Sequence, residues 1–518
     1  MKRTTKNMTF LSVLGLLLAI SACTKNFDKI NTNPNAPNFV PTAYLLTCAE
    51  KGLMDFTWDR WWNASTGMIL AEYYSENLYT NESQFFFRTN LTYQYWGYFY
   101  GSGLNDQGGG AVTVAGMKSL QTIIDECNAT PSKYIASGAI NNQKAVATIL
   151  EVWEYQNLTD TWGDIPFSQA LKDVTITQPK YDKQSDIYTG LLAKLDSAIA
   201  WIDVSKTDLQ GDLIYSGNMS AWLKFANSLK LRVAIRMADV NSTVAKTEIM
   251  AAVAGGVFSS NADNALLPYI SAGPNYNPLY YDRFVSGRTD FCASNVIVDV
   301  MNRLNDPRRP FYFDTIAAGG TNPGGTFVGR PFGQNGSDAG NTQLSSVSQP
   351  SGASNSSSTG LSLSATAPGV FLDYAQVQFI LAEAVERGYI SGTAESYYDA
   401  GIQGSFDFWG APGGAAYIAQ DSVGYTALKS AGRTWKSIIG EQKWLALYNQ
   451  GIQGWIEYRR LDFGILQAPV DGFLVGSAVP VRMQYPYNES QLNPTGYNGA
   501  ISDQGADVMA TKVWWDIN

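Results

Sequence analysis

Apolar side chains recur at helical spacing in five long stretches of the sequence. Four stretches cover residues 146–153, 188–202, 222–237 and 377–384, and the fifth covers 438–452. Residues three or four apart lie on one face of an α-helix, so each stretch predicts a helix whose apolar face packs on a partner. Trp153 and Trp222 lie on such faces, and we expect both in the core. The pattern predicts a mainly α-helical chain with little sheet.

Three long segments between these stretches lack the helical period. Residues 54–112 are crowded with aromatic side chains, residues 268–291 combine prolines with tyrosines, and residues 319–368 are rich in Gly, Ser, Asn and Thr. Loops of this length in a folded protein are mostly functional or disordered. We therefore predict a helical scaffold that carries three elaborate loops.

The N-terminus is typical of a lipoprotein export signal. Three basic residues among the first six precede an apolar run, Phe10–Ile20, which is shorter than the roughly 20 residues of a membrane span. Two small residues then precede Cys23, the arrangement that a lipoprotein signal peptidase cleaves before the cysteine is acylated. An ordinary secretory signal with a chance cysteine is the alternative. We predict a signal peptide over 1–22, a lipid-anchored spacer over 23–40 and one helical domain over 41–518.

The charge of the mature chain argues against a nucleic-acid partner. Residues 1–22 carry three basic and no acidic side chains, so their removal changes the balance from 36 Lys+Arg to 33, against 45 Asp+Glu, or −12. Phosphate recognition needs a basic face, which this composition does not favour. No other stretch is long and apolar enough for a membrane span, so the lipid is the expected anchor.

The side chains available exclude most catalytic and metal chemistry. The chain has no histidine, which removes Ser-His-Asp and Cys-His nucleophiles and histidine-bound zinc. Cys48, Cys127 and Cys292 are too few for an all-thiolate zinc site, and we expect them buried as small apolar groups. We expect no cofactor. Asp-rich turns over 203–212 and 261–264 leave structural calcium open as an alternative.

A series of motifs resembles the outer-membrane nutrient-binding lipoproteins of the SusD/RagB family, in its SusD-like branch. Each motif is weak alone, but their order is shared over about 490 residues. The motifs are Phe27–Asn35, Asp160–Phe167, Lys224–Arg232, Asp306–Arg308, Gln378–Ala384, Lys443–Leu447 with Tyr458–Arg460, Tyr485–Glu489, Leu492–Pro494 and Val513–Asp516.

The resemblance implies a fold, a partner and a location. The fold is mainly α, with tetratricopeptide-like helix pairs and irregular loops that form the ligand face. The partner is a SusC-type TonB-dependent outer-membrane transporter, to which the lipoprotein delivers a captured oligosaccharide or peptide without catalysis. The implied location is the outer membrane, with the protein anchored through Cys23 and facing the cell exterior.

The aromatic segments supply the candidate ligand contacts. A flat ring can stack on the apolar face of a sugar while polar groups bond its hydroxyls. The alternative, which applies to most individual rings, is packing of the loops against the helices. The alternation of Tyr93 and Tyr95 favours a strand with one face outward. The candidates are Trp61, Trp62, Arg88, Tyr93, Tyr95, Trp96 and Tyr98 in the first segment, and Tyr276 and Tyr280 in the second.

Two groups of charged residues each have more than one possible role. A lipid-anchored glycoside hydrolase would need two carboxyl groups flanking one bond, and the pairs Asp160 with Asp164 and Glu151 with Glu154 are candidates. The Arg459–Arg460 pair, with Glu457 nearby, is either an anion site or a buried structural ion network. We favour the network, because charges removed from water need partners.

Overall fold

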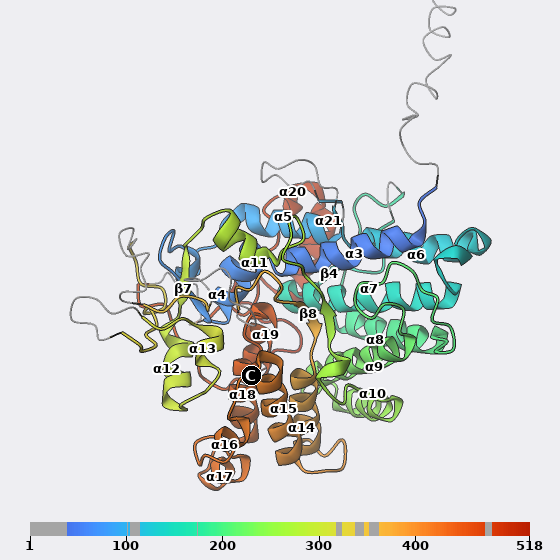
Figure 1. Cartoon of the computed structure of the whole chain (residues 1–518). Helices are drawn as coiled ribbons and strands as arrows, with labels where there is room; N and C mark the ends of the chain where they lie inside the picture. The colour runs from blue at the N-terminus through green and yellow to red at the C-terminus, as the bar shows by residue number, and fades with distance from the viewer. Residues whose placement is uncertain are drawn as a thin grey trace, which may run out of the picture. The chain divides into compact units, whose positions relative to one another are not determined.

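Helices dominate the computed structural model of the chain (Figure 1). It describes residues 39–100, 102–103, 114–172, 175–316, 324–336, 347–351, 362–471 and 479–517. With 55% of the chain helical and 5% in strands, the prediction of a mainly α fold is confirmed. Contacts group Thr42–Asn518 into one compact unit.

The principal helices are α3 (Thr42–Thr57), α5 (Thr89–Tyr100), α6 (Met117–Ala129), α7 (Ile140–Trp162), α8 (Gln184–Trp201), α9 (Met219–Arg236), α10 (Ser242–Gly255), α12 (Asn295–Arg303), α14 (Tyr374–Glu386), α15 (Ala394–Trp409), α18 (Trp435–Ala446), α19 (Gly451–Leu461) and α21 (Pro494–Gln504). Shorter helices are α4 (Met68–Leu70), α11 (Pro278–Tyr280), α13 (Arg309–Tyr312), α16 (Gly414–Ile418), α17 (Tyr425–Ser430) and α20 (Glu489–Leu492). Two π-helices, η1 (Arg60–Gly67) and η7 (Tyr281–Val285), lie in the first and second aromatic segments.

Consecutive helices pack on one another as pairs of the tetratricopeptide type. In Figure 1, α6, α7, α8, α9 and α10 follow one another through the cyan-to-green part of the chain, and each contacts the next. Helix α7 is buried by its neighbours along most of its length. Helix α9 also packs against α14, which connects this series of helices to the C-terminal part of the chain. Trp153 and Trp222 are 2% and 0% exposed, so the prediction that both belong to the core is confirmed.

The fifth apolar stretch is divided between two helices, which corrects the prediction of one. Helix α18 ends at Ala446 and α19 begins at Gly451, with Asn449 between them at φ +71°. The break lets the backbone of Gly451 meet that of Gly67 at the end of η1. A Cβ on Gly451 would lie 2.2 Å from the Gly67 carbonyl carbon, so only glycine permits this contact.

The described residues contain four two-stranded antiparallel pairs, of which the first and the fourth connect distant parts of the chain. They are β1 (Tyr74–Glu76) with β7 (Phe291–Ala293), β2 (Ser102–Gly103) with β3 (Val114–Ala115), β4 (Ile165–Pro166) with β5 (Tyr181–Asp182), and β6 (Ala265–Leu267) with β8 (Gly369–Leu372). In the first pair, Ser75 lies opposite Cys292. This pair therefore joins the first aromatic segment to the second. The fourth pair holds residues 369–372 against residues 265–267, which directly precede the second aromatic segment.

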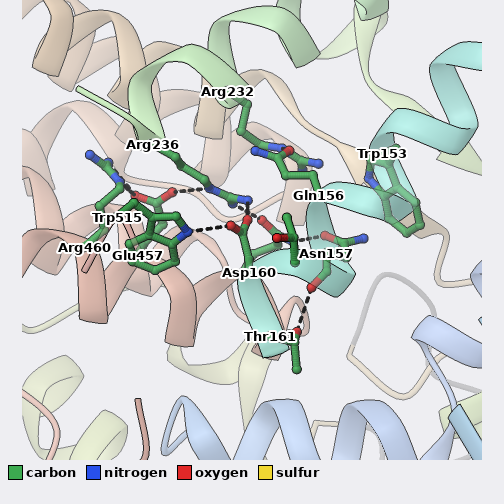
Figure 2. A network of polar contacts seen from close by, with 12 residues as sticks. Trp153, Gln156, Asn157, Asp160, Thr161, Arg232, Arg236, Glu457, Arg460 and Trp515 are labelled. Atoms are coloured by element: carbon green, nitrogen blue, oxygen red, sulfur yellow. Dashed lines mark hydrogen bonds and ion pairs between the residues drawn. The ribbon is translucent and has the colours of Figure 1, made fainter. Parts of the chain in front are cut away.

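A buried ion network ties α7, α9, α19 and the C-terminus together (Figure 2). Asp160 accepts hydrogen bonds from Arg236 and from the Trp515 indole nitrogen, at 2.8 Å for the latter. Arg236 in turn lies 3.7 Å from Glu457. Figure 2 shows these side chains converging from α7, α9, α19 and the C-terminal segment, so the network holds the scaffold together as well as satisfying its own charges.

The network continues from Glu457 into α14 and α18. Glu457 is 2.9 Å from Lys443 and 2.7 Å from Arg460, and Arg460 is 2.5 Å from Glu383. These cations hold the pKa of Glu457 below its usual range, against the effect of burial. Arg460 and Glu457 thus form the predicted structural network rather than an anion site, while Arg459 donates to the carbonyls of Val481 and Asp160.

Two local predictions are wrong. Residues 89–100 form helix α5, so Tyr93 and Tyr95 are not in a strand and the first aromatic segment is largely helical. Cys48 is exposed on α3, whereas Cys127 and Cys292 are buried as expected. Among the described residues, no helix has both the length and the apolarity to cross a membrane.

Candidate functional site

The two aromatic segments meet at the π-helices. The Asp59 carboxylate accepts hydrogen bonds from the Trp62 backbone, at 2.6 Å, and from the Tyr95 hydroxyl, which fixes the start of η1. Burial raises the pKa of Asp59 to about 7, although the Tyr95 hydroxyl lowers it in part. From η1, Arg60 reaches Asp282 of η7, 3.6 Å away.

A cluster of arginines and rings occupies this junction, and we call it the arginine–aromatic face. It consists of Arg60, Trp61, Tyr79, Arg88 and Arg288. The guanidinium groups of Arg60 and Arg88 lie 4.3 and 4.9 Å from the Trp61 ring centroid. Those of Arg88 and Arg288 lie 5.9 and 5.7 Å from the Tyr79 ring centroid. These distances are within the range of cation–π attraction, so cations and rings order one another.

Buried carboxylates hold the three arginines. Asp290, 4% exposed, pairs with Arg60 and, at 2.7 Å, with Arg288. Glu82, 0% exposed, lies 2.7 Å from Arg88. The acids are buried, whereas the side chains of Arg88 and Arg288 are 36% and 35% exposed, so these two arginines are pre-oriented as hydrogen-bond donors.

Carboxylates stand beside the arginines of the face. Burial raises the pKa of Asp282 to about 6 and that of Glu76 well above its ordinary value, with Glu82 a further cause for Glu76. Burial also raises the pKa of Glu82, and Arg88 lowers it in part. Asp282, Glu82 and Asp290 pair with the three guanidinium groups, and a face of rings and paired donors suits a neutral, hydroxyl-rich ligand.

Tyr79 is the exposed ring of this face. Its side chain is 59% exposed, and its backbone has φ +58°, in the left-handed region that a bulky residue rarely adopts. Its carbonyl accepts a 2.8 Å hydrogen bond from the Asn81 backbone, which closes the turn. Strained backbone of this kind concentrates at ligand sites.

The second segment contributes a ladder of rings. Tyr276 and Tyr280 have centroids 5.4 Å apart, and Tyr280 and Phe284 are 4.9 Å apart. These rings are partly exposed, and the neighbouring Tyr281 is 52% exposed. Helix α11 packs on η1, so the ladder lies beside the helix that carries Arg60 and Trp61.

The structure places the other predicted contacts elsewhere. Trp62, Tyr95 and Tyr98 are 4%, 1% and 4% exposed and belong to the core, which corrects the expectation that these rings face solvent. Trp62 stacks on Tyr95 at 4.8 Å. The physical reason is that Tyr95 and Tyr98 lie on the buried face of α5, and Trp62 packs against that face from η1.

Two predicted rings of α5 lie near the surface, apart from the arginine–aromatic face. Trp96 is 9% exposed and, with Tyr100 and Glu489, lines a cavity of about 430 Å³. Tyr93 is 46% exposed, and its ring centroid is 5.9 Å from that of Tyr487. Of the predicted set, the junction thus brings together Trp61, Arg88, Tyr276 and Tyr280. Cys23 lies outside the described residues.

The carboxylate pairs considered for hydrolysis are built into the scaffold. Asp160 is in the ion network, Asp164 accepts from the Gln184 backbone at 2.8 Å, and Glu151 pairs with Lys194 at 2.9 Å. Glu154 is 1% exposed. None of these four carboxyl groups is placed to flank a bound glycosidic bond.

The turns considered for calcium are satisfied by protein donors. Asp212 accepts from the Trp222 indole at 2.8 Å, and Asp263 caps its own turn at Ser259 and pairs with Lys224. Within the described ranges, no group of three or more acidic or cysteine side chains is arranged to hold a metal ion.

Sequence reasoning missed Arg60, Tyr79 and Arg288. Tyr79 lies in the polar stretch Tyr79–Thr80–Asn81, whose Thr and Asn residues favour a turn and could have indicated an exposed ring. Asp290 pairs with both Arg60 and Arg288 and so positions them in the face. The Arg60–Asp290 pair joins parts of the chain that are distant in sequence, so a local sequence pattern does not reveal it.

Solved structures confirm the fold. A chitin-binding protein superposes with a TM-score of 0.75 at 26% identity, covering 92% of this chain and 100% of its own. A SusD homolog from Bacteroides uniformis gives 0.73 at 26% identity, with the same coverage of both chains. A chitin-binding SusD homolog from Flavobacterium johnsoniae gives 0.73 at 23% identity, covering 91% of this chain and 99% of its own.

Sequence comparison gives the same answer for the family. A search of curated proteins found no match. The profile of the SusD-like family, described as starch-binding and associating with the outer membrane, matches residues 34–486. Because this match spans most of the sequence, the chain belongs to the SusD-like family of outer-membrane-associated, starch-binding proteins.

Proposed function

We propose that this protein captures a neutral oligosaccharide on the arginine–aromatic face and delivers it, uncleaved, to a SusC-type TonB-dependent transporter. The observation that carries the proposal is an exposed ring, Tyr79, between guanidinium groups fixed by buried acids. The ring offers a surface for the apolar face of a sugar, and the arginines offer donors to its hydroxyls. The 26% identical chitin-binding protein and the family description support a glycan as the ligand.

Calorimetry with protein that lacks residues 1–23 tests the ligand and the face together. The panel contains starch-type and chitin-type oligosaccharides and mixed peptides. Tyr79→Ala should weaken binding of the active glycan by about tenfold, equivalent to about 1.4 kcal/mol. Tyr44→Ala is the matched control, because Tyr44 is 69% exposed on α3, outside the face. Equal affinities of the two variants would refute the face, and binding of peptides alone would replace the glycan.

Mass spectrometry of the incubated glycans tests the absence of catalysis. We expect the oligosaccharides to be recovered intact after prolonged incubation with the protein. Shortened products that disappear on a single acid-to-amide substitution would instead establish a hydrolase.

Anchoring and delivery form the second half of the proposal. The signal over 1–22, the spacer over 23–40 and acylation of Cys23 would place the 41–518 domain at the outer membrane, facing the exterior. Cys23→Ser should release the protein from membranes. Cross-linking in intact cells should recover the TonB-dependent transporter with the wild-type protein; recovery of no transporter would argue against delivery.

A further inference from the structure

A second cavity lies where the end of α15, the α18–α19 turn and β8 meet. Its volume is about 450 Å³, within the size range of small-ligand sites. The rings of Trp58, Phe408, Trp409 and Tyr448 line it, together with amide side chains that include Asn264 and Asn449. None of these residues belongs to the arginine–aromatic face, so the cavity is a separate candidate.

The charge of the lining restricts the ligand. Asp407, exposed at the cavity, is the one acidic residue among those that line it, and no lysine or arginine does so. An anionic ligand would find no cation there, and the buried part of the wall offers no carboxylate to a cation. The cavity therefore favours a neutral ligand with apolar faces and polar edges.

Two buried polar atoms of the lining residues need a partner. The Trp409 indole nitrogen and the side-chain amide oxygen (Oδ1) of Asn449 make no hydrogen bond to any described residue. The two residues are 8% and 2% exposed. An unpaired buried donor and an unpaired buried acceptor both cost free energy, which a bound hydroxyl group can recover, because a hydroxyl donates and accepts.

Both groups are held in place by the protein. The Trp409 ring lies edge-on to Tyr312, with centroids 5.0 Å apart. The Asn449 amide nitrogen donates to the Ser362 carbonyl at 3.3 Å, and its backbone carbonyl accepts from Asn63 at 3.0 Å. With its amide nitrogen and backbone fixed in this way, the Asn449 side-chain oxygen is pre-organised for a ligand.

We propose that this cavity is a second binding site, which takes one neutral pyranose unit, free or at the end of an oligosaccharide. The rings contact the C–H faces of the sugar, the Trp409 N–H donates to one hydroxyl, and Asn449 accepts from another. The inference goes beyond capture at the arginine–aromatic face and does not depend on it.

The test follows the Trp409 indole N–H by NMR of protein labelled with ¹⁵N-tryptophan, its resonance assigned with Trp409→Phe. Glucose and N-acetylglucosamine are the probes. We expect one of them to shift this resonance saturably in the wild type and equally in Tyr79→Ala. Asn449→Gly, which keeps the left-handed backbone allowed, should weaken the sugar at least about tenfold. The melting temperature of each variant checks its folding.

The outcomes separate the two sites. No shift with either sugar up to about 100 mM, a hundredfold above a millimolar dissociation constant, would overturn the second site. A shift that Tyr79→Ala abolishes would also overturn it, because the sugar would then bind at the arginine–aromatic face. A shift that persists in Tyr79→Ala and weakens in Asn449→Gly supports it, even if oligosaccharide capture at the face fails.

Discussion

Replacing Glu154 by glutamine should stabilise the protein at neutral pH. Glu154 lies on α7, is 1% exposed, and lines a small internal cavity with Trp58 and Asn157. Burial raises the pKa of Glu154 to about 8, and the nearby Asn157 amide offsets only part of the increase. A buried carboxyl group with so few compensating contacts lowers the free energy of unfolding at pH values where the unfolded state is ionised.

The raised pKa sets the size and the sign of the effect. The ordinary value is 4.5, so below that pH both the folded and the unfolded states are protonated and no stability is lost. As the pH rises from 4.5 toward about 8, the unfolded state ionises while the folded state keeps its proton, and the free energy of unfolding falls. One pKa unit is worth about 1.4 kcal/mol, so the cost reaches about 3 kcal/mol at pH 7. Glutamine does not ionise and avoids this cost.

Urea unfolding of the wild type and Glu154→Gln between pH 4 and pH 8 measures the difference. We expect the advantage of the variant to grow with pH across this range, toward about 3 kcal/mol at pH 7. Asp125→Asn, which replaces an exposed carboxylate of α6 by the same kind of acid-to-amide change, is the control. A Glu154→Gln difference that does not change with pH would show that the reasoning from burial is wrong.

Three further predictions concern the scaffold. Glu457→Gln leaves Lys443 and Arg460 facing a neutral amide, so the free energy of unfolding in urea should drop by about 3–5 kcal/mol; an unchanged midpoint would contradict the network's role. Gly451→Ala forces a Cβ to within 2.2 Å of Gly67 and should lower stability by about 1–3 kcal/mol in thermal unfolding, whereas a neutral result would mean that η1 can shift freely. In folded protein lacking residues 1–23, a thiol reagent should label exposed Cys48 and spare buried Cys127 and Cys292 until urea is added; labelling of all three at one rate would contradict the burial.

The helices were predictable because their signal is local. Apolar residues at helical spacing identify a buried face within one turn or two, whatever the rest of the chain does. The division of the fifth stretch into α18 and α19 was not predictable in this way. It depends on the contact between Gly451 and Gly67, which belong to distant parts of the sequence.

The first aromatic segment shows how a correct signal can be misread. Leu91, Tyr95 and Phe99 are spaced four apart and all face the core from α5, while Tyr93 faces solvent. Tyr93 and Tyr95 in the same segment also alternate with a polar residue, and this alternation favoured a strand. Because aromatic residues are common in both strands and cores, composition could not decide, and the longer helical period was the better guide.

The candidate site was predictable in its segments but not in its individual residues. Trp61 and Arg88 were expected there, whereas Tyr79 and Arg288 were not. A sequence shows which side chains can bind sugar, but tertiary contacts such as the β1–β7 pairing and the ion pairs of Arg60 with Asp282 and Asp290 bring the segments together. Exposure then decides which rings remain available, and exposure depends on the whole fold.

Burial also explains why similar pairs of arginine and acid serve different ends in this protein. The Arg460 side chain is 2% exposed, and its two carboxylate partners, Glu383 and Glu457, enclose it, so its charge is paired inside the scaffold. Arg88 also has a buried acid, Glu82, but its own side chain is 36% exposed. A guanidinium group has five donors, more than one carboxylate can accept. When only the acid is buried, the arginine is fixed in direction and still turned to solvent, which is the arrangement expected for the proposed capture of a hydroxyl-rich ligand.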